Sequence, residues 1–467
     1  MSGDTTDVGW LALFKLEWLP ALAMILGGVL LHSMNVLLVA TVLPSIVGEV
    51  GGAPLMSWPS TAFLASSIIA ATCSSLLSAV TGPSRAFCVG AVIFCAGTLL
   101  CAVAPSMGVV IAGRFVQGFG GGVLAAVAYV LVRGTFPAVL WPRVFGMISV
   151  VWTVSIVVGP LVGGIFAALG IWRGAFYVVT VLAGMLAIGA WAGLPVTQSG
   201  VAALPRVPAG RVALVCLAIA AMSFAAVVET PVAKASQIMV ALAALAVMLR
   251  LDRRATVPLL PSDAFALNTA TGAGLWIVLL VCLAFNPLQI YVPIFLQRLH
   301  GLDSLTAGYA VAGASMAWSI AALAVAGLSG AWSARLIIAG PVAMAAGLAG
   351  IAALISSGPL LAIVHAIALI GIGIGVTWAF TMQRIMGEAR PGEEDVAASS
   401  IAIVQQTGMA LGAALAGLAA NTAGFSIDAD FNGIARAAIW VPASLVPGAL
   451  AAALMGVLLR RTGRQGR

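Results

Sequence analysis

Three ionisable side chains lie inside long apolar stretches of the sequence: His32, Arg114 and His365. Such groups are costly in an apolar medium, about 2.5–3.5 kcal/mol for a central arginine on membrane-insertion scales, so they usually face a cavity and have a function. Histidine titrates near neutral pH, and His32 or His365 could bind and release a proton. Arg114 could orient an anionic ligand or repel a proton from its carrier. The alternatives are structural: neutral packing histidines, and an arginine that caps backbone carbonyls.

Polar and aromatic residues recur in the same stretches and extend this set. Asn35 follows His32 by three residues and shares its face of a helix, where it could hydrogen-bond a ligand or the imidazole. Residues of this kind more often face lipid or lie in the aromatic belts at a membrane surface. Further residues of this kind could line a path for a ligand: Trp152, Trp276, Asn286, Gln289, Tyr291, Trp378, Gln383, Gln405 and Gln406.

The composition identifies the medium around these residues. Of the 467 residues, 62% are hydrophobic and only 7% are charged, a balance outside the range of ordinary soluble proteins. Apolar runs of about 20 residues recur along the chain, and each could cross a hydrocarbon core of roughly 30 Å as a helix. The runs are too long and too uniformly apolar for the strands of a membrane β-barrel. We therefore predict an all-α integral membrane protein.

The apolar runs fall into three groups separated by two polar connectors. Six runs lie within residues 20–194, two within 211–250 and six within 268–459. We predict fourteen transmembrane helices: two six-helix bundles with two inserted helices between them. The middle two runs are at the short limit for a span, and the count is twelve if they lie on the membrane surface. The predicted spans are 20–47, 57–80, 86–104, 108–132, 144–169, 172–194, 211–228, 234–250, 268–297, 304–328, 334–356, 360–384, 396–421 and 437–459.

Positive charges set the predicted orientation. With an even number of spans and the N-terminus inside, sixteen of the 21 Lys and Arg residues lie on the cytoplasmic side and four outside, with Arg114 in the membrane. Topology thus accounts for the net charge of +7, and no nucleic-acid partner is needed. We predict a multi-pass protein of the plasma (inner) membrane with both termini in the cytoplasm.

An internal repeat relates the two six-helix groups. A shift of 253 residues superposes "GFGGG" at 118–122 on "GIGIG" at 371–375, and the small residues of 155–164 on those of 408–417. The same shift places Trp152 on Gln405. Two bundles repeated in the same orientation are the plan of transporters with a midplane site between the halves. Taken alone, small residues at these spacings also let helices pack closely.

The sequence offers no metal, cofactor or ATP site. All six cysteines lie in apolar runs without metal-ligand spacing, and no GxxxxGK[ST] loop is present. We assign no catalytic residue and predict that the protein is not an enzyme. The energy for transport would then come from an ion gradient, most simply a proton gradient, or from the gradient of the cargo.

The fifth apolar run, "GMISVVWTVSIVVGPLVGG", resembles the antiporter motif of the major facilitator superfamily, and more narrowly its fourteen-helix drug:proton antiporter branch. Serine occupies one of the motif's glycine positions, at Ser155. The fourth run, "GRFVQGFGGG", is similar to a second motif of the family through Arg114, Gln117, Gly118 and Gly120. The resemblance implies a transporter in which the first, fourth and twelfth helices line the cavity. The matching motif residues of the fifth run are Gly146, Gly159, Pro160, Gly163 and Gly164.

Two positions depart from the pattern of that branch. An aspartate usually stands nine residues before the proline that closes the first helix, and here the residue is Asn35, before Pro44. The loop after the second helix has Arg85 but lacks the acid of the usual latch. All 14 acids fall at helix ends, in loops or in tails, so the histidines become the candidate proton sites. Without an acid to pair Arg114, the cavity would favour neutral or anionic cargo.

Three functions remain open. The first is a proton-coupled exporter of hydrophobic drugs or metabolites that works by alternating access. The second is a dedicated carrier, either a uniporter or an anion-selective importer of a small metabolite, that is not coupled to protons through a carboxylate. The third is a receptor or lipid-handling scaffold that transports nothing. The expected partners are a small-molecule substrate and the lipid bilayer, and a monomer suffices for alternating access.

Overall fold

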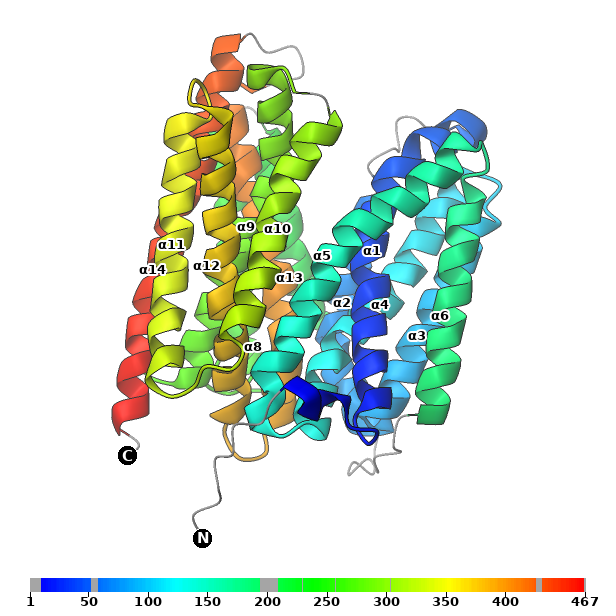
Figure 1. The fold of residues 1–467 in the computed structure, drawn as a ribbon, viewed down its shortest axis with the longest axis vertical. Helices are drawn as coiled ribbons and strands as arrows, with labels where there is room; N and C mark the ends of the chain where they lie inside the picture. The colour runs from blue at the N-terminus through cyan, green and yellow to red at the C-terminus, as the bar shows by residue number, and fades with distance from the viewer. Residues whose placement is uncertain are drawn as a thin grey trace. The chain divides into compact units, whose positions relative to one another are not determined.

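The computed structural model describes residues 10–51, 58–193, 209–228, 230–256, 258–302, 304–425 and 431–465. Within these ranges the chain forms fourteen α-helices and two short 3-10 helices, with no β-strand (Figure 1). Each predicted span corresponds to one of the α-helices. Eleven helices in the described part are long and apolar enough to cross a membrane. The described parts of α1, α2 and α7 provide only shorter apolar stretches, so a count of fourteen spans stays a prediction.

The chain divides into two units. Unit 1 comprises Met1–Pro208 with Ala398–Ile403, and unit 2 comprises Ala209–Ala397 with Val404–Arg467. The helices of unit 1 are α1 (Leu19–Val50), α2 (Trp58–Thr81), α3 (Pro83–Ala102), α4 (Met107–Thr135), α5 (Trp141–Ala168) and α6 (Arg173–Gly193), with the short η1 (Trp10–Phe14) and η3 (Ala138–Leu140). The helices that lie wholly or mostly in unit 2 are α7 (Ala209–Val227), α8 (Pro231–Asp252), α9 (Ala270–His300), α10 (Ser304–Val325), α11 (Ala331–Leu354), α12 (Leu360–Gly387), α13 (Glu394–Thr422) and α14 (Phe431–Gln465).

Glycines on α4 allow this helix to pack closely between two neighbours in unit 1. A Cβ atom at Gly118 or Gly122 would overlap the backbone of α2 at Phe63 or Ser67. A Cβ atom at Gly120, on another face of α4, would overlap the backbone of α3. Helices that approach to backbone contact gain van der Waals packing, which is the main source of helix association in lipid.

Helix α12 of unit 2 has the same arrangement. Added Cβ atoms at Gly371 and Gly375 would overlap the backbone of α10, and one at Gly373 would overlap the backbone of α11. The central helix therefore packs between its two predecessors in the same way in each unit. This contact pattern agrees with the 253-residue shift that superposes the two glycine rows.

The motif of α5 provides a second close contact, with α1. A Cβ atom at Gly163 would overlap the Thr41 hydroxyl and lie 2.8 Å from the carbonyl oxygen of Leu38. Gly408 and Gly412 of α13 pack in a similar way against the backbone of α9. Pro160 lies inside α5, which continues through it as one helix. The motif thus contains both a glycine that packs closely on α1, Gly163, and a proline that removes one backbone hydrogen bond from α5, Pro160.

One end of unit 1 is tied by the first residues of the segment "WRGAFYV". The Trp172 indole donates a 2.7 Å hydrogen bond to Glu49, in the last turn of α1. Arg173 donates to the other carboxylate oxygen of Glu49 and, at 2.8 Å, to the Ala104 carbonyl between α3 and α4. These bonds join the end of α1, the α3–α4 connection and the start of α6.

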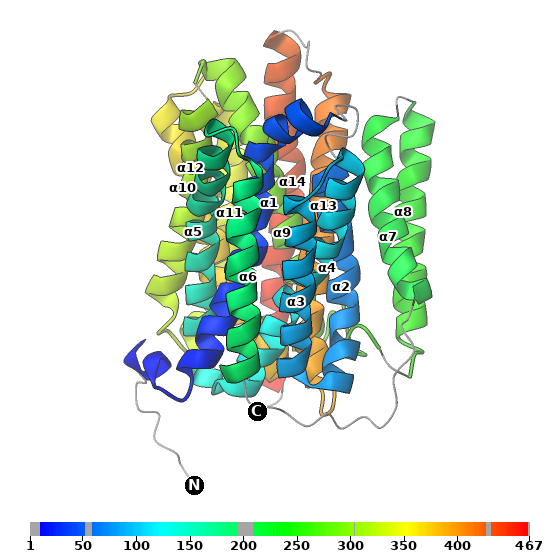
Figure 2. The same cartoon turned by 90° about the vertical axis from the view of Figure 1, so that its right-hand side faces the viewer.

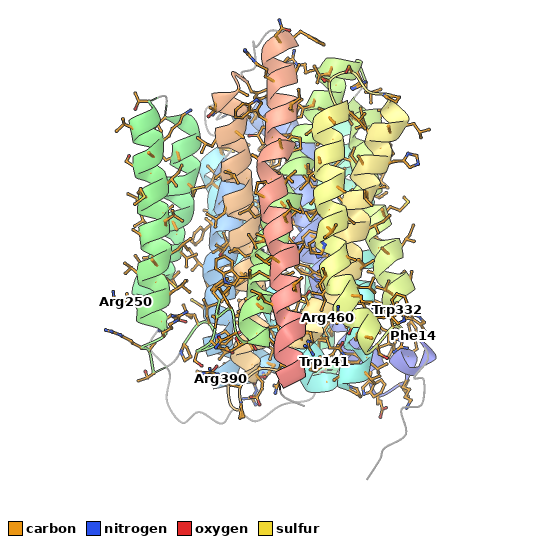
Figure 3. The ribbon with its side chains drawn as sticks, turned by 90° about the vertical axis from the view of Figure 1, so that its left-hand side faces the viewer. Phe14, Trp141, Arg250, Trp332, Arg390 and Arg460 are labelled. Atoms are coloured by element: carbon orange, nitrogen blue, oxygen red, sulfur yellow. The ribbon has the colours of Figure 1, made fainter. Side chains whose placement is uncertain are left out.

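Helices α7 and α8 run side by side in unit 2 (Figure 2). Their shared core consists of small side chains, with Ala218 and Ala221 of α7 against Ala241 and Ala244 of α8. Arginines gather toward one end of unit 2, where Arg250, Arg390 and Arg460 lie (Figure 3). There Arg390 donates a 2.9 Å hydrogen bond to Ser262 in the connector between α8 and α9.

Adjacent glycines of the α5 motif give a matched stability test. Gly163→Ala is expected to destabilise the protein by about 1–3 kcal/mol, because its methyl group meets α1 in a packed contact. Gly164→Ala places its methyl group where nothing lies within 4 Å. We expect this variant to be more stable by about 0.5–1 kcal/mol, because alanine has the higher helix propensity. Thermal unfolding of the protein in detergent, followed by tryptophan fluorescence, measures both. Equal shifts for the two variants would refute the packing role of Gly163.

Candidate functional site

A buried arginine lies at the centre of a polar cluster in unit 1. Arg114 of α4 is only 1% exposed. Its Nε donates to the Pro59 carbonyl oxygen at 3.3 Å, and its Nη1 donates to the side-chain oxygens of Asn35 and Gln117. Its Cζ also lies 4.2 Å from the centre of the Phe63 ring, which is a cation–π contact. The guanidinium therefore contacts α1, α2 and its own helix.

Two amides and a hydroxyl complete the cluster. Gln117 Nε2 donates to Asn35 Oδ1 at 2.9 Å and to Thr98 Oγ1 at 2.7 Å. Asn35 Oδ1 thus accepts bonds from both Arg114 and Gln117, while its Nδ2 donates to the Leu31 carbonyl of its own helix. Asn35 and Gln117 are fully buried. The network joins α1, α3 and α4 through neutral acceptors.

His32 lies against the same aromatic ring as Arg114. The centres of the His32 and Phe63 rings are 5.5 Å apart, and His32 is only 3% exposed. Gly121 of α4 leaves space for the imidazole, because a Cβ atom there would lie 2.7 Å from His32 Nδ1. The structure therefore brings His32, Asn35, Arg114 and Gln117 together, on α1 and α4.

Carboxylates are absent from this cluster. In the ranges that the structure describes, every Asp and Glu lies at a helix end or in a connector, as the sequence predicts. Arg114 is consequently a buried cation that neutral oxygens and one aromatic ring stabilise. Within the same ranges its Nη2 makes no hydrogen bond, so this donor is available to an acceptor on a ligand. The eight carboxylates concerned are Glu17, Glu49, Asp252, Asp263, Glu388, Glu393, Glu394 and Asp395.

A family model described as "Major Facilitator Superfamily" matches residues 25–416. The chain belongs to the major facilitator superfamily. It is thus a transporter of this superfamily and a multi-pass membrane protein, with small-molecule substrates and the bilayer as its partners.

Two kinds of relative support this assignment. A protein of Mycobacterium tuberculosis strain H37Rv, named "probable multidrug-efflux transporter", is 34% identical over 438 residues, which are 91% of this chain and 92% of that one. "Multidrug resistance protein 3" of Bacillus subtilis is 30% identical over 154 residues, covering 33% of this chain and 30% of its own length.

Solved structures share the fold at low sequence identity. The human organic anion transporter MFSD10 superposes with a TM-score of 0.70 at 14% identity, covering 95% of this chain and 100% of that one. The proton:xylose symporter XylE gives a TM-score of 0.65 at 15% identity, with 93% and 94% coverage. At these identities the likeness concerns the fold alone.

The superfamily motif in α5 contains Ser155 where the family has a glycine, and the structure explains the replacement. Its hydroxyl lies 2.5 Å from the Ser33 hydroxyl of α1, one residue after His32. Ser155 also donates to the carbonyl of Val151 in its own helix. The serine thereby adds a hydrogen bond between α1 and α5 beside the Gly163 contact.

The unit 2 candidates are spread over three helices. Trp378 of α12 is buried, and its ring centre lies 6.0 Å from that of Trp318, whose ring also meets Phe285 at 5.5 Å. The Asn286 side chain donates a 3.2 Å hydrogen bond to the Met409 carbonyl, which connects α9 to α13. Tyr291 stacks on Phe295. The remaining candidates Gln289, Gln383, Gln405 and Gln406 are half-buried, as is Trp152 in unit 1.

Two predicted candidates make local structural contacts. His365 is exposed and its Nδ1 bonds the Leu361 carbonyl of the preceding helical turn. The Trp276 indole donates to the Phe265 carbonyl at 3.0 Å, and their rings meet edge to face. In contrast to His32, neither contact brings the side chain into a cluster with other candidates.

Four residues that contact the candidates do not stand out in the sequence. Phe63, Thr98 and Gly121 belong to the cluster around His32 and Arg114, and Trp318 packs on Trp378. Apolar, threonine and glycine residues of this kind are common in any transmembrane helix. The one signal is Gly121, the middle glycine of "GGG" at 120–122. Its two neighbours face other helices, so Gly121 indicates a close contact on a third face of α4.

A pair of threonines isolates the bond between Gln117 and α3. Thr98→Val leaves one buried Gln117 N–H without its acceptor, and we expect a loss of about 1–3 kcal/mol in unfolding free energy. Thr180→Val is the control, because each hydroxyl donates to the carbonyl four residues earlier. Thermal unfolding of both variants measures the difference. A Thr98→Val loss no larger than that of Thr180→Val would mean that the Gln117 bond contributes nothing.

Proposed function

We propose that this member of the superfamily exports hydrophobic drugs or metabolites in exchange for protons, by alternating access. The observation that carries the proposal is that His32 and Arg114 lie on one Phe63 ring, in a buried cluster without a carboxylate. The 34% identity with a protein named as a probable multidrug-efflux transporter, over 91% of this chain, supports export of drugs.

His32 is the proposed proton carrier. It is the one buried histidine in the described ranges, since His300 bonds the Ile355 carbonyl from a half-buried position and His365 is exposed. A protonated His32 would bring a second positive charge next to Arg114. Repulsion between the two makes that state costly unless the cluster rearranges. Proton binding would thereby be coupled to a change in the bonds between α1 and α4.

The cluster also suggests how cargo would compete with the proton. A neutral acceptor on the cargo can take the free Nη2 donor of Arg114 while the cluster keeps its present bonds, whereas protonation of His32 would repel Arg114 and displace that donor. Cargo binding and proton binding would then be alternatives, which is the requirement for exchange. Hydrophobic cargo would contribute through burial of apolar surface rather than through an ion pair.

The proposed topology has fourteen spans, with α7 and α8 both crossing the bilayer and both termini in the cytoplasm of a plasma (inner) membrane. The arginines at one end of unit 2 (Figure 3) are consistent with a cytoplasmic end. A monomer suffices for this mechanism, and no cofactor other than the proton gradient is required.

Efflux of a fluorescent lipophilic dye from loaded cells, with and without a proton ionophore, tests the proton role. We expect the wild type to stop exporting dye when the ionophore is added. His32→Ala is expected to lower ionophore-sensitive efflux at least tenfold. His365→Ala is the matched control and should retain efflux, since that ring is exposed and bonds its own helix.

The possible results separate the residues. Full efflux by His32→Ala with loss in His365→Ala would transfer the proton role to His365. Efflux that persists with the ionophore in the wild type would exclude a proton-coupled mechanism. Correct folding of each variant is checked by size exclusion and thermal unfolding, so that a folding defect is not read as a loss of coupling.

The second candidate function is a dedicated carrier for a small anionic metabolite. It is favoured by the buried charge of Arg114, which has no carboxylate partner within the described ranges, and by the neutral Asn35 in contact with it. Such a carrier would move an anion down its gradient and ignore an ionophore. No export of dye would be expected.

Substitution of Asn35 changes the charge of the cluster without a large change in shape. Asn35→Asp places a carboxylate against Arg114, so we expect anionic cargo to be transported at least tenfold more slowly and cationic dyes to be transported better. Asn35→Leu is the uncharged control: it removes the acceptor that aspartate keeps, and it adds no charge. Uptake of labelled anions and dyes into proteoliposomes measures both. Equal effects of the two substitutions would show that charge does not select the cargo.

A further inference from the structure

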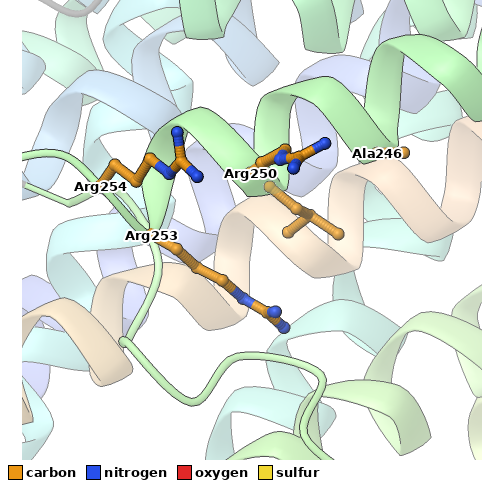
Figure 4. A pocket seen from close by; sticks show the side chains of 5 residues that line it. Ala246, Arg250, Arg253 and Arg254 are labelled. Carbon is orange, nitrogen blue, oxygen red and sulfur yellow. The ribbon is translucent and has the colours of Figure 1, made fainter.

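We propose that a basic pocket at the end of α8 binds the phosphodiester headgroup of an anionic phospholipid. The pocket has a volume of about 420 Å³ and is lined by Ala246, Leu249, Arg250, Arg253 and Arg254 (Figure 4). Neither the transport activity nor the cluster around Arg114 bears on this proposal, and it would hold whatever cargo the protein carries.

The lining residues form one face of a single helical end. The spacing of three and four residues places Ala246, Leu249 and Arg250 on the same side of α8, and Arg253 and Arg254, directly after the helix end, complete the lining. The opposite side packs on α7 through Ala241 and Ala244. The face changes from apolar to basic toward the helix end.

This change of character matches the profile of a bilayer surface. The segment Val232–Asp252 is long and apolar enough to span the hydrocarbon core, so its last turn lies near the headgroups. Leu242 is 56% exposed and continues the same face four residues before Ala246. An acyl chain along Leu242, Ala246 and Leu249 would bring the lipid phosphate to the three arginines.

The arginines are available for an anion. All three are exposed, and Arg253 donates one 3.3 Å hydrogen bond to the Ala264 carbonyl. In the ranges that the structure describes, Arg250 and Arg254 have no ion pair or hydrogen bond. Guanidinium groups bind phosphate oxygens through charge-assisted hydrogen bonds.

The carboxylate nearest in sequence is occupied elsewhere. Asp252 is buried and forms an ion pair with Arg211 of α7. It also accepts hydrogen bonds from the backbone N–H groups of Leu259, at 3.0 and 3.1 Å, and Leu260, at 2.9 Å. These bonds hold the negative charge away from the pocket. They also fold the connector back against α8 and so fix Arg253 and Arg254 at its rim.

Positive charge at a helix end has simpler explanations. Arginines in the last turn of a helix interact favourably with the helix dipole and stabilise the helix. The cytoplasmic ends of transmembrane helices are also basic in general. Neither explanation requires a pocket, an apolar wall on the same face, or the burial of the one acid within the cluster. A basic pocket beside a span at the membrane surface is the kind of site that binds anionic lipid headgroups.

The test uses the full chain, delipidated in detergent, with thermal unfolding followed by tryptophan fluorescence. Phosphatidylglycerol in mixed micelles is expected to raise the melting temperature saturably, while phosphatidylcholine does not. Arg250→Gln with Arg254→Gln should raise the phosphatidylglycerol concentration for half of the effect roughly tenfold or more. Native mass spectrometry should show the loss of a bound phosphatidylglycerol in the same variant.

The matched control removes the same charge at other exposed arginines, Arg85→Gln with Arg460→Gln. We expect it to change the half-effect concentration by less than about twofold. If both double substitutions weakened the effect of phosphatidylglycerol equally, the proposal would be overturned, because the lipid would then respond only to the overall positive charge of the protein. Equal stabilisation by phosphatidylcholine would also overturn it. A similar effect of inorganic phosphate alone would replace the lipid with a soluble anion.

Discussion

The buried guanidinium of Arg114 is the constraint on which the centre of unit 1 depends. A cation away from water needs hydrogen-bond acceptors and compensation of its charge, and here the acceptor oxygens are neutral. Asn35, Gln117 and the Pro59 carbonyl supply them, and Phe63 covers the charge. These groups come from α1, α2 and α4, so the position of one side chain determines how three helices meet. A shift of α1 removes the Asn35 acceptor, and a shift of α2 removes the Pro59 acceptor and the Phe63 ring.

Glycine makes that cluster geometrically possible. Gly118 and Gly122 bring α4 to backbone contact with α2, and Gly120 brings it to α3, where Gln117 reaches Thr98. Gly121 leaves space for His32 of α1. In lipid, apolar side chains gain little from burial against each other, and close packing replaces the hydrophobic effect. In α12 the 253-residue shift places Ile367 at the position of Arg114, and the glycine row lies beside the aromatic pair Trp318 and Trp378 instead. The shared scaffold thus carries different chemistry in the two units.

The sequence predicted the helices and the carboxylate positions, because each depends on local pattern, and it selected Asn35, Arg114 and Gln117 as candidates without predicting the bonds between them. Apolar length defines the spans, and an ionisable group in an apolar run needs partners. Asn35 and Gln117 were found through spacing and motif, and they do bond Arg114. Phe63 and Thr98 could not be found, since their role arises from helix packing and not from their own type. His365 was selected by type, and the structure shows it exposed against its own helix.

The distribution of charge has a further consequence for energetics. Carboxylates in the described ranges lie at helix ends or in connectors, while Arg114 lies deep inside unit 1, so its positive charge has no carboxylate beside it. An aspartate at position 35 would neutralise that charge through an ion pair, at the cost of desolvating a second ion. The asparagine provides the same acceptor to Arg114 and Gln117 without that cost. Because the field of Arg114 is then not cancelled, it acts on any charged or polar group that enters, and the amide at position 35 sets the electrostatics of the cluster.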